Sequence, residues 1–288
     1  MTLDHIREII SQPQFMSFFP GASFDDVGLL ILTARTRSAM GIIGRIAFPL
    51  FAFFIVEGTR KTRSMPRYIG RLFLFALISE PLYNFGFGID PTWEGLLKNL
   101  AKHRFTNVFF TLALGALMIW VFELIEKKLP KYKWFIDIPV LLAFMLAAGR
   151  IDCDYSEFGV MLIGGLYLAK RKKFQMIVIV VWSFIIYILY QASFGSCWYA
   201  LSLDSWLNMI SASLSAVVVW LYNGERGPKF KWGFYGNADL RLFSREKDHK
   251  SKPFSRENPN YSAYPYIYYP AHIALLLFIS SLITPISR

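Results

Sequence analysis

Apolar residues recur along the whole chain in stretches of about 20, and short polar segments separate these stretches. A helix needs roughly this length to cross the hydrocarbon core of a bilayer. The pattern therefore predicts an all-α fold, a polytopic membrane bundle with eight spans. Residues 1–10 are predicted to form a helical stub that is too short to span alone. The predicted spans are 39–58, 67–88, 105–126, 134–149, 157–169, 174–191, 205–222 and 265–284.

The composition supports a membrane location. Of the 288 residues, 55% are hydrophobic and 18% are charged. Soluble domains contain about 25% charged residues. We therefore predict a multi-pass protein of the plasma (inner) membrane, folded as a single domain over 1–288.

Lys and Arg collect in alternate connections between the predicted spans, and such an excess marks the cytoplasmic side. By contrast, the connection 150–157 is acidic and 191–204 holds no Lys or Arg, so we place both outside. The net charge of +11 is then a bias of the cytoplasmic loops and does not indicate nucleic-acid binding. The basic connections are 59–67, 127–133, 170–173 and the long segment 223–264.

Arg45 lies several residues inside the first predicted span. An ionised side chain at that depth costs roughly 2.5–3.5 kcal/mol on insertion scales, so it is functional by default. The predicted topology brings other polar residues to the same outward-facing layer, whereas His272 lies about two turns into the last span from the cytoplasmic end. The other members of this layer are Asp4, His5, Glu80, Asn84, Thr106, Asn107, Asp152, Asp154 and Tyr155.

Two features of this layer have alternative interpretations. Asn84, Thr106 and Asn107 are uncharged and are expected to bridge neighbouring helices more often than to bind a substrate. Cys153 and Cys197 both fall on the outer side. They could form a disulfide or remain two separate thiols. The sequence leaves both alternatives open, because two cysteines in a chain of this length do not define a disulfide framework.

Four short motifs stand in order along the chain. They are Asp4-His5-Ile6, Gly44-Arg45-Ile-Ala-Phe-Pro49, Asp154-Tyr155 with Gly159, and Tyr268-Tyr269-Pro270-Ala271-His272. These motifs resemble the TraX family, which is named for the inner-membrane enzyme that N-acetylates the pilin of F-type conjugation systems. The resemblance covers most of the chain and implies an integral-membrane acyltransferase that uses acetyl-CoA. Family members carry a full first span ahead of the Asp-His pair, so the resemblance also implies either an upstream start or an abbreviated first helix.

The polar layer suits acyl transfer, which needs a base for the proton of the acceptor and hydrogen-bond donors for the oxyanion. Adjacent side chains on a helix diverge by about 100°, so Asp4 is predicted to pair with Arg45 while His5 faces the substrate. His272 is the rival base. The sequence has no Gly-x-Ser-x-Gly elbow and no zinc-ligand spacing, which favours direct transfer without a metal.

Acetyl-CoA is made in the cytoplasm, so we expect basic residues there to bind its phosphates and a tyrosine to stack on its adenine. The pantetheine arm would extend between the helices, past His272, to the outer layer. Asp152, Asp154, Tyr155, Glu80 and Asn107 are the predicted substrate-binding residues. The predicted donor-binding residues are Arg60, Arg63, Arg67, Arg71 and Tyr268, with the segment 223–264 and Tyr264 and Tyr266 as further candidates.

The acceptor stays open between a peptide amine, an amino sugar and a lipid-linked glycan. The alternative function is a transporter or lipid-linked export component that uses the charged layer as a relay. Against it, the sequence shows no inverted repeat. A structural scaffold would leave Arg45, Asp4 and His272 without a role. Release of free CoA from acetyl-CoA would distinguish an acyltransferase from both.

Overall fold

The computed structural model describes all residues except 20–25, 88–91, 103, 194–202, 223–263 and 284–288. Over the described residues the chain is all-helical, which confirms the all-α part of the predicted fold class. The helices are α1 (Thr2–Ile9), α2 (Gln12–Met16), α3 (Val27–Gly44), α4 (Ala47–Lys61), α5 (Met65–Phe87), α6 (Trp93–Ala101), α7 (Val108–Lys128), α8 (Lys133–Ile151), α9 (Ser156–Leu168), α10 (Lys172–Ser193), α11 (Leu203–Leu221) and α12 (Tyr264–Leu282), with the 3₁₀ turn η1 (Pro130–Tyr132) before α8.

Every predicted span from 67–88 onward corresponds to one helix, with ends that differ by a few residues. In the described part of the chain, two helical stretches, Val27–Lys61 (α3 with α4) and Val108–Lys128 (α7), are long and apolar enough to cross a membrane by themselves. Shorter apolar helices are Ser156–Leu168, Ser205–Leu221 and Tyr266–Leu282. These helices are consistent with a membrane protein, and the count of eight spans stays a prediction.

The first predicted span, 39–58, is wrong in its bounds. The helix begins at Val27, where the Asp26 side chain accepts a hydrogen bond from the Leu29 amide at 2.9 Å, and it changes from α3 to α4 at Arg45 and Ile46. Proline has no backbone N–H, so Pro49 cannot donate to the carbonyl four residues earlier, which belongs to Arg45. Arg45 therefore lies at a break between two helices.

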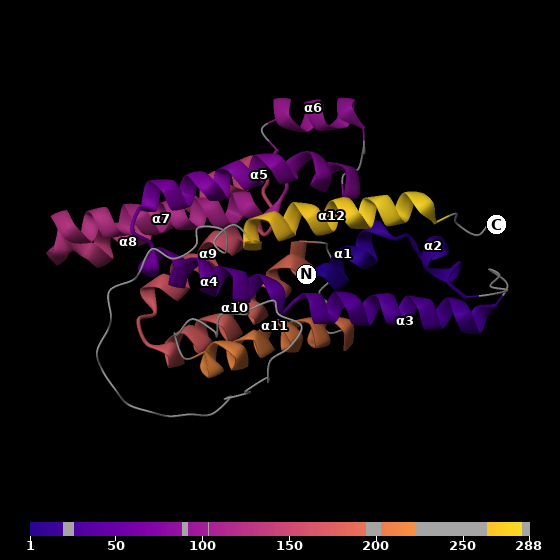
Figure 1. Cartoon of the computed structure of the whole chain (residues 1–288). Coiled ribbons are helices and arrows are strands. Elements are labelled where there is room, and N and C mark those ends of the chain that lie inside the picture. Colours follow the sequence, from indigo (N-terminus) through magenta and orange to yellow (C-terminus); the bar gives the residue numbers. More distant parts are fainter. Residues whose placement is uncertain (20–25, 88–91, 103, 194–202, 223–263, 284–288) are drawn as a thin grey trace, which may run out of the picture.

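Two short helices fall in segments that were predicted to be connections. The first, α2, lies in 11–38, and the second, α6, lies between the spans 67–88 and 105–126. Thr92 caps α6 by accepting a hydrogen bond from the Gly95 amide at 3.0 Å. Figure 1 shows α6 set apart on the surface of the bundle.

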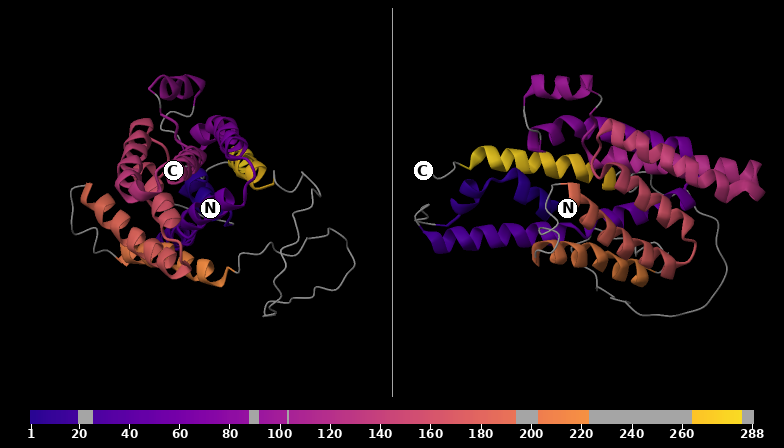
Figure 2. Two further views of the ribbon diagram at one scale, coloured as in Figure 1. Left: turned by 90° about the vertical axis from the view of Figure 1, so that its left-hand side faces the viewer. Right: turned by 180° about the vertical axis from the view of Figure 1, so that it is seen from behind.

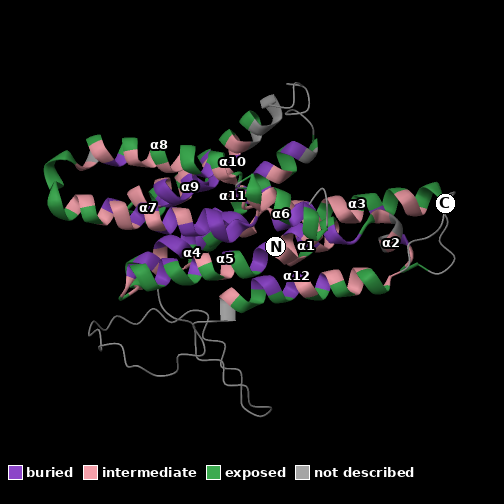
Figure 3. Cartoon of the chain, turned by 90° about the horizontal axis from the view of Figure 1, so that it is seen from above, coloured by how far each residue is buried: buried purple, intermediate pink, exposed green. Residues whose placement is uncertain are grey.

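The core is centred on α7, which packs against α4, α5, α8 and α9. Buried residues concentrate along α4, α5, α7 and α9 in Figure 3, whereas α8 is mostly exposed or intermediate. The outer faces of α8, α10, α11 and α12 instead expose large apolar side chains, among them Leu146, Ile188, Leu214 and Leu275. An apolar outer surface of this extent supports a membrane location.

The basic connections α4–α5, α7–α8 and α9–α10 lie at one end of the bundle, on the left in Figure 1 and on the right in the view from behind in Figure 2. At this end the Lys61 ammonium donates to the Tyr222 hydroxyl at 2.8 Å. The Lys172 ammonium donates to the Tyr222 carbonyl. The turn between α8 and α9 lies at the other ends of these two helices. This arrangement agrees with the sidedness predicted from the positive charges.

Candidate functional site

The N-terminal stub forms α1, which lies inside the bundle against α3, α5 and α12 (Figure 1). Gly44 permits this position, because a Cβ added to Gly44 would come within 2.5 Å of the Asp4 Cβ. The close approach places His5, which is 6% exposed, in the interior. Gly44 thus allows α1 to pack closely against α3, and the charged residue Arg45 follows it directly in the sequence.

A polar cavity of about 230 Å³ lies where α1 meets the α3–α4 break, α5 and the α8–α9 turn. Five of the predicted site residues, drawn from three separate parts of the sequence, share this cavity. Its acidic and basic groups lie within one small volume, so they interact strongly. Its polar lining is formed by Asp4, His5, Arg7, Glu8, Arg45, Tyr83, Asp154 and Tyr155.

The turn between α8 and α9 presents Asp154 to the cavity in a strained backbone. Asp152, Tyr155 and Ser156 all have positive φ angles, of 52°, 60° and 40°. This region costs a residue with a side chain about 1–2 kcal/mol, and such strain clusters at functional sites. The Tyr155 ring stacks on Phe48 with centroids 3.6 Å apart, which holds the turn against α4.

Asp154 is half-buried, and it lies in the turn, outside both flanking helices. Burial raises the pKa of its carboxyl to about 7, and the positive charge of Arg45 lowers that pKa against the effect of burial. The Thr111 hydroxyl on α7 donates to the Asp154 carbonyl. Asp154 and Arg45 are therefore electrostatically coupled within the cavity.

His5 and His272 form a pair, which the sequence did not predict. The His5 Nδ1 and the His272 Nε2 lie 2.7 Å apart, and the two rings are almost parallel, with centroids 4.9 Å apart at 7°. The predicted separation of His272 from the outward layer is therefore wrong. His272 is the ninth residue of a 19-residue helix, so it lies at mid-depth.

Asp4 approaches Arg7 on its own helix, with its Oδ1 atom 4.0 Å from the Arg7 Nε. That oxygen is buried and has no hydrogen-bond partner among the described residues. Arg7 also pairs with Glu8. Asp4 and Arg45 line the same cavity, and their direct pairing stays a prediction.

Glu80 and Asn107 do not line the polar cavity, and they are hydrogen-bonded to each other. The Glu80 carboxylate accepts hydrogen bonds from the backbone and side chain of both Thr106 and Asn107, the shortest from Asn107 Nδ2 at 2.6 Å. The Asn107 side chain also caps α7, by accepting from the Phe109 amide at 3.0 Å. This geometry favours the helix-bridging interpretation for Thr106 and Asn107.

Two other predicted residues at the outer side also lie apart from the cavity. Asp152 is on the surface, where its carboxylate lies 3.2 Å from the Arg104 Nε with 60% of the side chain exposed. Cys153 is buried, and Cys197 lies outside the described residues. Neither of the two interpretations of the cysteine pair is therefore decided.

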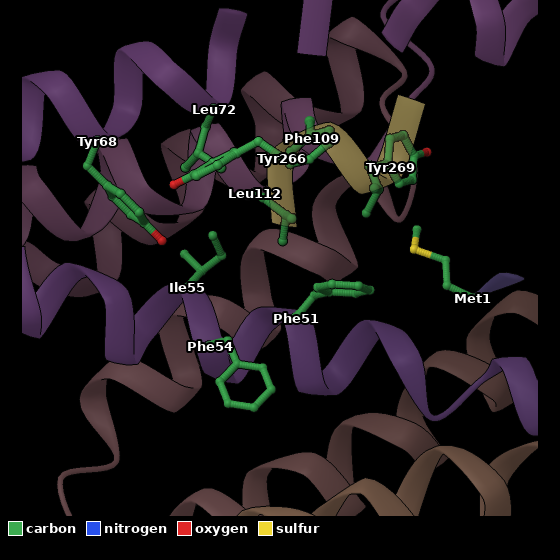
Figure 4. A pocket seen from close by; sticks show the side chains of 11 residues that line it. Met1, Phe51, Phe54, Ile55, Tyr68, Leu72, Phe109, Leu112, Tyr266 and Tyr269 are labelled. Carbon is green, nitrogen blue, oxygen red and sulfur yellow. The ribbon is translucent and has the colours of Figure 1, made fainter. Parts of the chain in front are cut away.

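An apolar cavity of about 250 Å³ lies between α4, α5, α7 and α12 (Figure 4). Tyr68 and Tyr266 lie towards one end of it, and Met1 and Tyr269 towards the other. Met1 also lines the polar cavity, so the two cavities share this residue in their lining. The remaining lining is apolar, from residues such as Phe51, Ile55, Leu72 and Leu112.

The predicted donor-binding residues lie towards the basic end. Arg67 and Arg71 are exposed and one helical turn apart on α5, and the Arg71 guanidinium lies over the Tyr266 ring at 5.9 Å from its centroid. Arg60 pairs with Glu57 at 3.0 Å, and Arg63 is exposed in the α4–α5 connection. The segment 223–263 lies outside the described residues. Tyr268 instead contacts α1, where its hydroxyl lies 2.6 Å from the Thr2 hydroxyl.

The TraX protein family matches residues 1–237 of this sequence. The chain belongs to the TraX family. The matched range includes Asp4-His5, Gly44-Arg45 and Asp154-Tyr155, and all the residues that line the polar cavity lie within it. The range ends before α12, and the resemblance of Tyr268–His272 to the family stays a prediction.

One curated relative is the "Probable fimbrial assembly protein FimC, serogroup H1" of Dichelobacter nodosus, which is 28% identical over 154 residues. The aligned part covers 52% of this chain and 59% of that protein, so the chain spans about three-fifths of the relative's length. No solved structure matches the chain.

Sequence reasoning missed the aromatic residues that enclose the histidine pair. Phe87 meets His5 edge-on with centroids 4.8 Å apart, and Tyr83 stacks on Phe87 at 4.5 Å. Tyr269 contacts both imidazole rings edge-on, at 5.8 and 5.6 Å. The four-residue spacing of Tyr83 and Phe87, which puts both on one face of α5, was a signal that could have found them.

Proposed function

We propose that this protein is a membrane-embedded acyltransferase that moves an acetyl group from acetyl-CoA to an amine or hydroxyl acceptor near the outer face. One observation carries the proposal. The apolar cavity has Tyr266, which lies beside the exposed Arg71, towards one end and Met1 towards the other, and Met1 also lines the polar cavity together with His5. Such a pair of cavities suits a donor with a charged head and a long arm, and an acceptor that enters from the other side.

Acetyl-CoA supplies an activated acetyl thioester when it is bound. The residues present fit this group. Arg67 and Arg71 offer two positive charges for its phosphates, and Tyr266 lies beside Arg71 as an aromatic surface. The apolar lining from Tyr68 to Tyr269 suits a narrow, mostly uncharged arm. Membership of the TraX family supports the same donor.

The polar cavity supplies the groups that an acceptor needs. The carboxyls of Asp4 and Asp154 attract a cationic amine, and Arg45 limits the negative charge between them. His5 lines the cavity and acts as the general base for the proton that the acceptor loses. The relative's name as a fimbrial assembly protein supports a pilin-like peptide as the acceptor.

Release of free CoA tests the proposal directly. The purified protein in detergent micelles is given acetyl-CoA and a peptide with a free N-terminal amine, and the free thiol is measured together with the acetylated peptide. We expect both products in equal amounts. A relay or export component would release neither, and that result would exclude the acyltransferase.

The predicted membrane topology is testable by cysteine labelling. In a variant with Cys153 and Cys197 replaced by serine, we expect cysteines at Thr62, Lys131 and Lys172 to react only with reagent supplied from the cytoplasm. A cysteine at Asp152 should react from outside, because it lies in the turn at the opposite ends of α8 and α9. Labelling of position 172 in intact cells by an impermeant reagent would contradict the orientation.

The proposed donor site predicts a selective effect on KM. Arg67→Ala and Arg71→Ala should each raise the KM for acetyl-CoA by about 3- to 10-fold, equal to roughly 0.6–1.4 kcal/mol, with a smaller change in kcat. Each should also reduce the salt dependence of that KM. Lys98→Ala is the charge-matched control, since Lys98 is 60% exposed and pairs with Glu94 on the surface helix α6. An unchanged KM in both arginine variants would exclude this part of α5.

A further inference from the structure

Two hydrogen bonds in series join His5 to a backbone carbonyl of α12. The His272 Nδ1 lies 2.8 Å from the Tyr268 carbonyl oxygen, and the His272 Nε2 lies 2.7 Å from the His5 Nδ1. A carbonyl oxygen can only accept, so the hydrogen of the first bond must be on the His272 Nδ1. The order of these bonds determines where each remaining hydrogen lies.

A neutral imidazole carries one N–H, so a neutral His272 that donates through Nδ1 must accept through Nε2. The His5 Nδ1 must then be the donor. This leaves the His5 Nε2 with a lone pair and no hydrogen. Both rings are only 6% exposed, and this degree of burial disfavours a resident positive charge on either one.

We infer that His272 is a positioning residue, which holds His5 in the Nδ1–H tautomer so that the His5 Nε2 is the general base. The inference rests on the proposed function and deepens it, because it assigns different roles to the two histidines. The polar cavity supports this division, since His5 is among its lining residues and His272 is not.

The pair also has a route for the charge that catalysis creates. The acceptor reacts as a hydroxyl or a neutral amine, so an ammonium first releases one proton to solvent. As the acceptor nitrogen or oxygen bonds to the acetyl carbon, its N–H or O–H bond breaks, a new N–H bond forms at the His5 Nε2, and the C–S bond of the thioester breaks. The Nδ1 proton of His5 then passes to the His272 Nε2, which places the positive charge on the ring that donates to the Tyr268 carbonyl. Both transfers reverse when His5 returns a proton to the leaving sulfur, so the pair ends neutral.

The packing around His272 fixes its ring for this role. The Tyr268 ring stacks on His272 with centroids 5.0 Å apart at 19°, and its hydroxyl is bonded to Thr2 on α1. Two contacts therefore hold α12 against α1, one between His272 and His5 and one between Tyr268 and Thr2. His272 and Tyr268 are one helical turn apart on α12. A ring held in this way keeps its Nε2 directed at His5.

The tautomer is measured by ¹⁵N NMR of the full-length protein in detergent, labelled at its four histidines. Single substitutions assign the signals. We expect His5 to show a protonated Nδ1 and an unprotonated Nε2 at pH 8, whereas free histidine in water favours the Nε2–H form. An Nε2–H tautomer on His5 in the unsubstituted protein would overturn the inference, whatever the activity.

Two substitutions separate positioning from space-filling. His272→Phe keeps an aromatic ring and removes the acceptor, so His5 should lose its Nδ1–H preference. We expect kcat to fall at least about 10-fold, with about 10⁴-fold as the extreme for a catalytic histidine in the wrong tautomer. His272→Gln offers a carbonyl oxygen to the His5 Nδ1, so it should retain the tautomer and restore activity above that of His272→Phe.

The results distinguish this inference from the proposed function. A His272→Phe protein with the original tautomer and full kcat would show that His272 only fills space, which overturns the inference. Failure of the unsubstituted protein to release CoA would overturn the proposed function and with it the catalytic role of His5. The NMR result would then decide the hydrogen-bond order by itself.

Discussion

Replacement of His5 by alanine is expected to lower kcat by about 10²–10⁴-fold, the usual contribution of a general base. The binding of acetyl-CoA should be unchanged, because the apolar cavity and the exposed arginines of α5 lie apart from the imidazole. His5 has this large effect because it presents the one imidazole that lines the polar cavity in the described part of the chain. The measurements are the rate of CoA release and the equilibrium binding of acetyl-CoA.

His272→Ala is the comparison that could contradict this assignment. If it abolishes turnover while His5→Ala keeps more than about a tenth of it, which is less than about 1.4 kcal/mol of barrier, the base is His272. Asn84→Ala is a control for damage to the interior, since Asn84 is 1% exposed and does not line either cavity described above. The Asn84 amide has no hydrogen-bond partner among the described residues, so Asn84→Ala should change stability little and leave turnover near that of the unsubstituted protein.

Most helices could be predicted from the sequence because each apolar stretch ends at charged or helix-capping residues. Lys128 and Lys172, for example, mark the end of α7 and the start of α10. The first span was misplaced because a hydropathy pattern does not register a proline that deprives Arg45 of a hydrogen-bond donor. Arg35 and Arg37 also lower the apolar content of α3, which concealed its true start at Val27.

The polar layer could be predicted in part, because alternating loop charge gives each residue an approximate depth. Depth alone correctly grouped Asp4, His5, Arg45, Asp154 and Tyr155. The predicted depth could not show which of these polar side chains form hydrogen bonds with each other. Glu80 lies at a similar depth, yet its carboxylate is occupied by hydrogen bonds from the start of α7.

The histidine pair could not be predicted because it depends on tertiary packing. α1 is only eight residues long, and its seat depends on the contact between Gly44 and Asp4. His272 was assigned a depth from the cytoplasmic end of its helix, without knowledge of which helix faces it. The two residues are 267 positions apart, so no local pattern relates them.

Arg45→Ala should damage both stability and turnover, because it removes positive charge from beside Asp4 and Asp154. Breaking a buried charge interaction costs about 3–5 kcal/mol at the upper end. Arg45 is half-buried, so we expect a smaller loss, which would still lower Tm by several degrees. The measurements are thermal unfolding in detergent and CoA release, both as a function of pH.

The pH dependence of that loss identifies its cause. The pKa of Asp154 is about 7 in the folded protein, above its ordinary value of 3.8, so the folded state holds a proton that the unfolded state has lost. The stability from this group therefore falls as pH rises through 7. Without Arg45 the folded pKa rises further, so the fall continues to higher pH. The Tm difference between Arg45→Ala and the unsubstituted protein should be small at pH 5 and large at pH 9.

A second substitution tests whether Asp154 is responsible. Arg45→Ala with Asp154→Asn has no carboxyl to ionise at this position, so its Tm should lose most of the extra pH dependence while turnover stays low. Arg45→Ala with Asp152→Asn is the matched control, since the Asp152 side chain is 60% exposed and contacts Arg104. It should keep the pH dependence of Arg45→Ala. Equal rescue by both substitutions would mean that Arg45 acts on the general charge of the turn, and the coupling to Asp154 would be excluded.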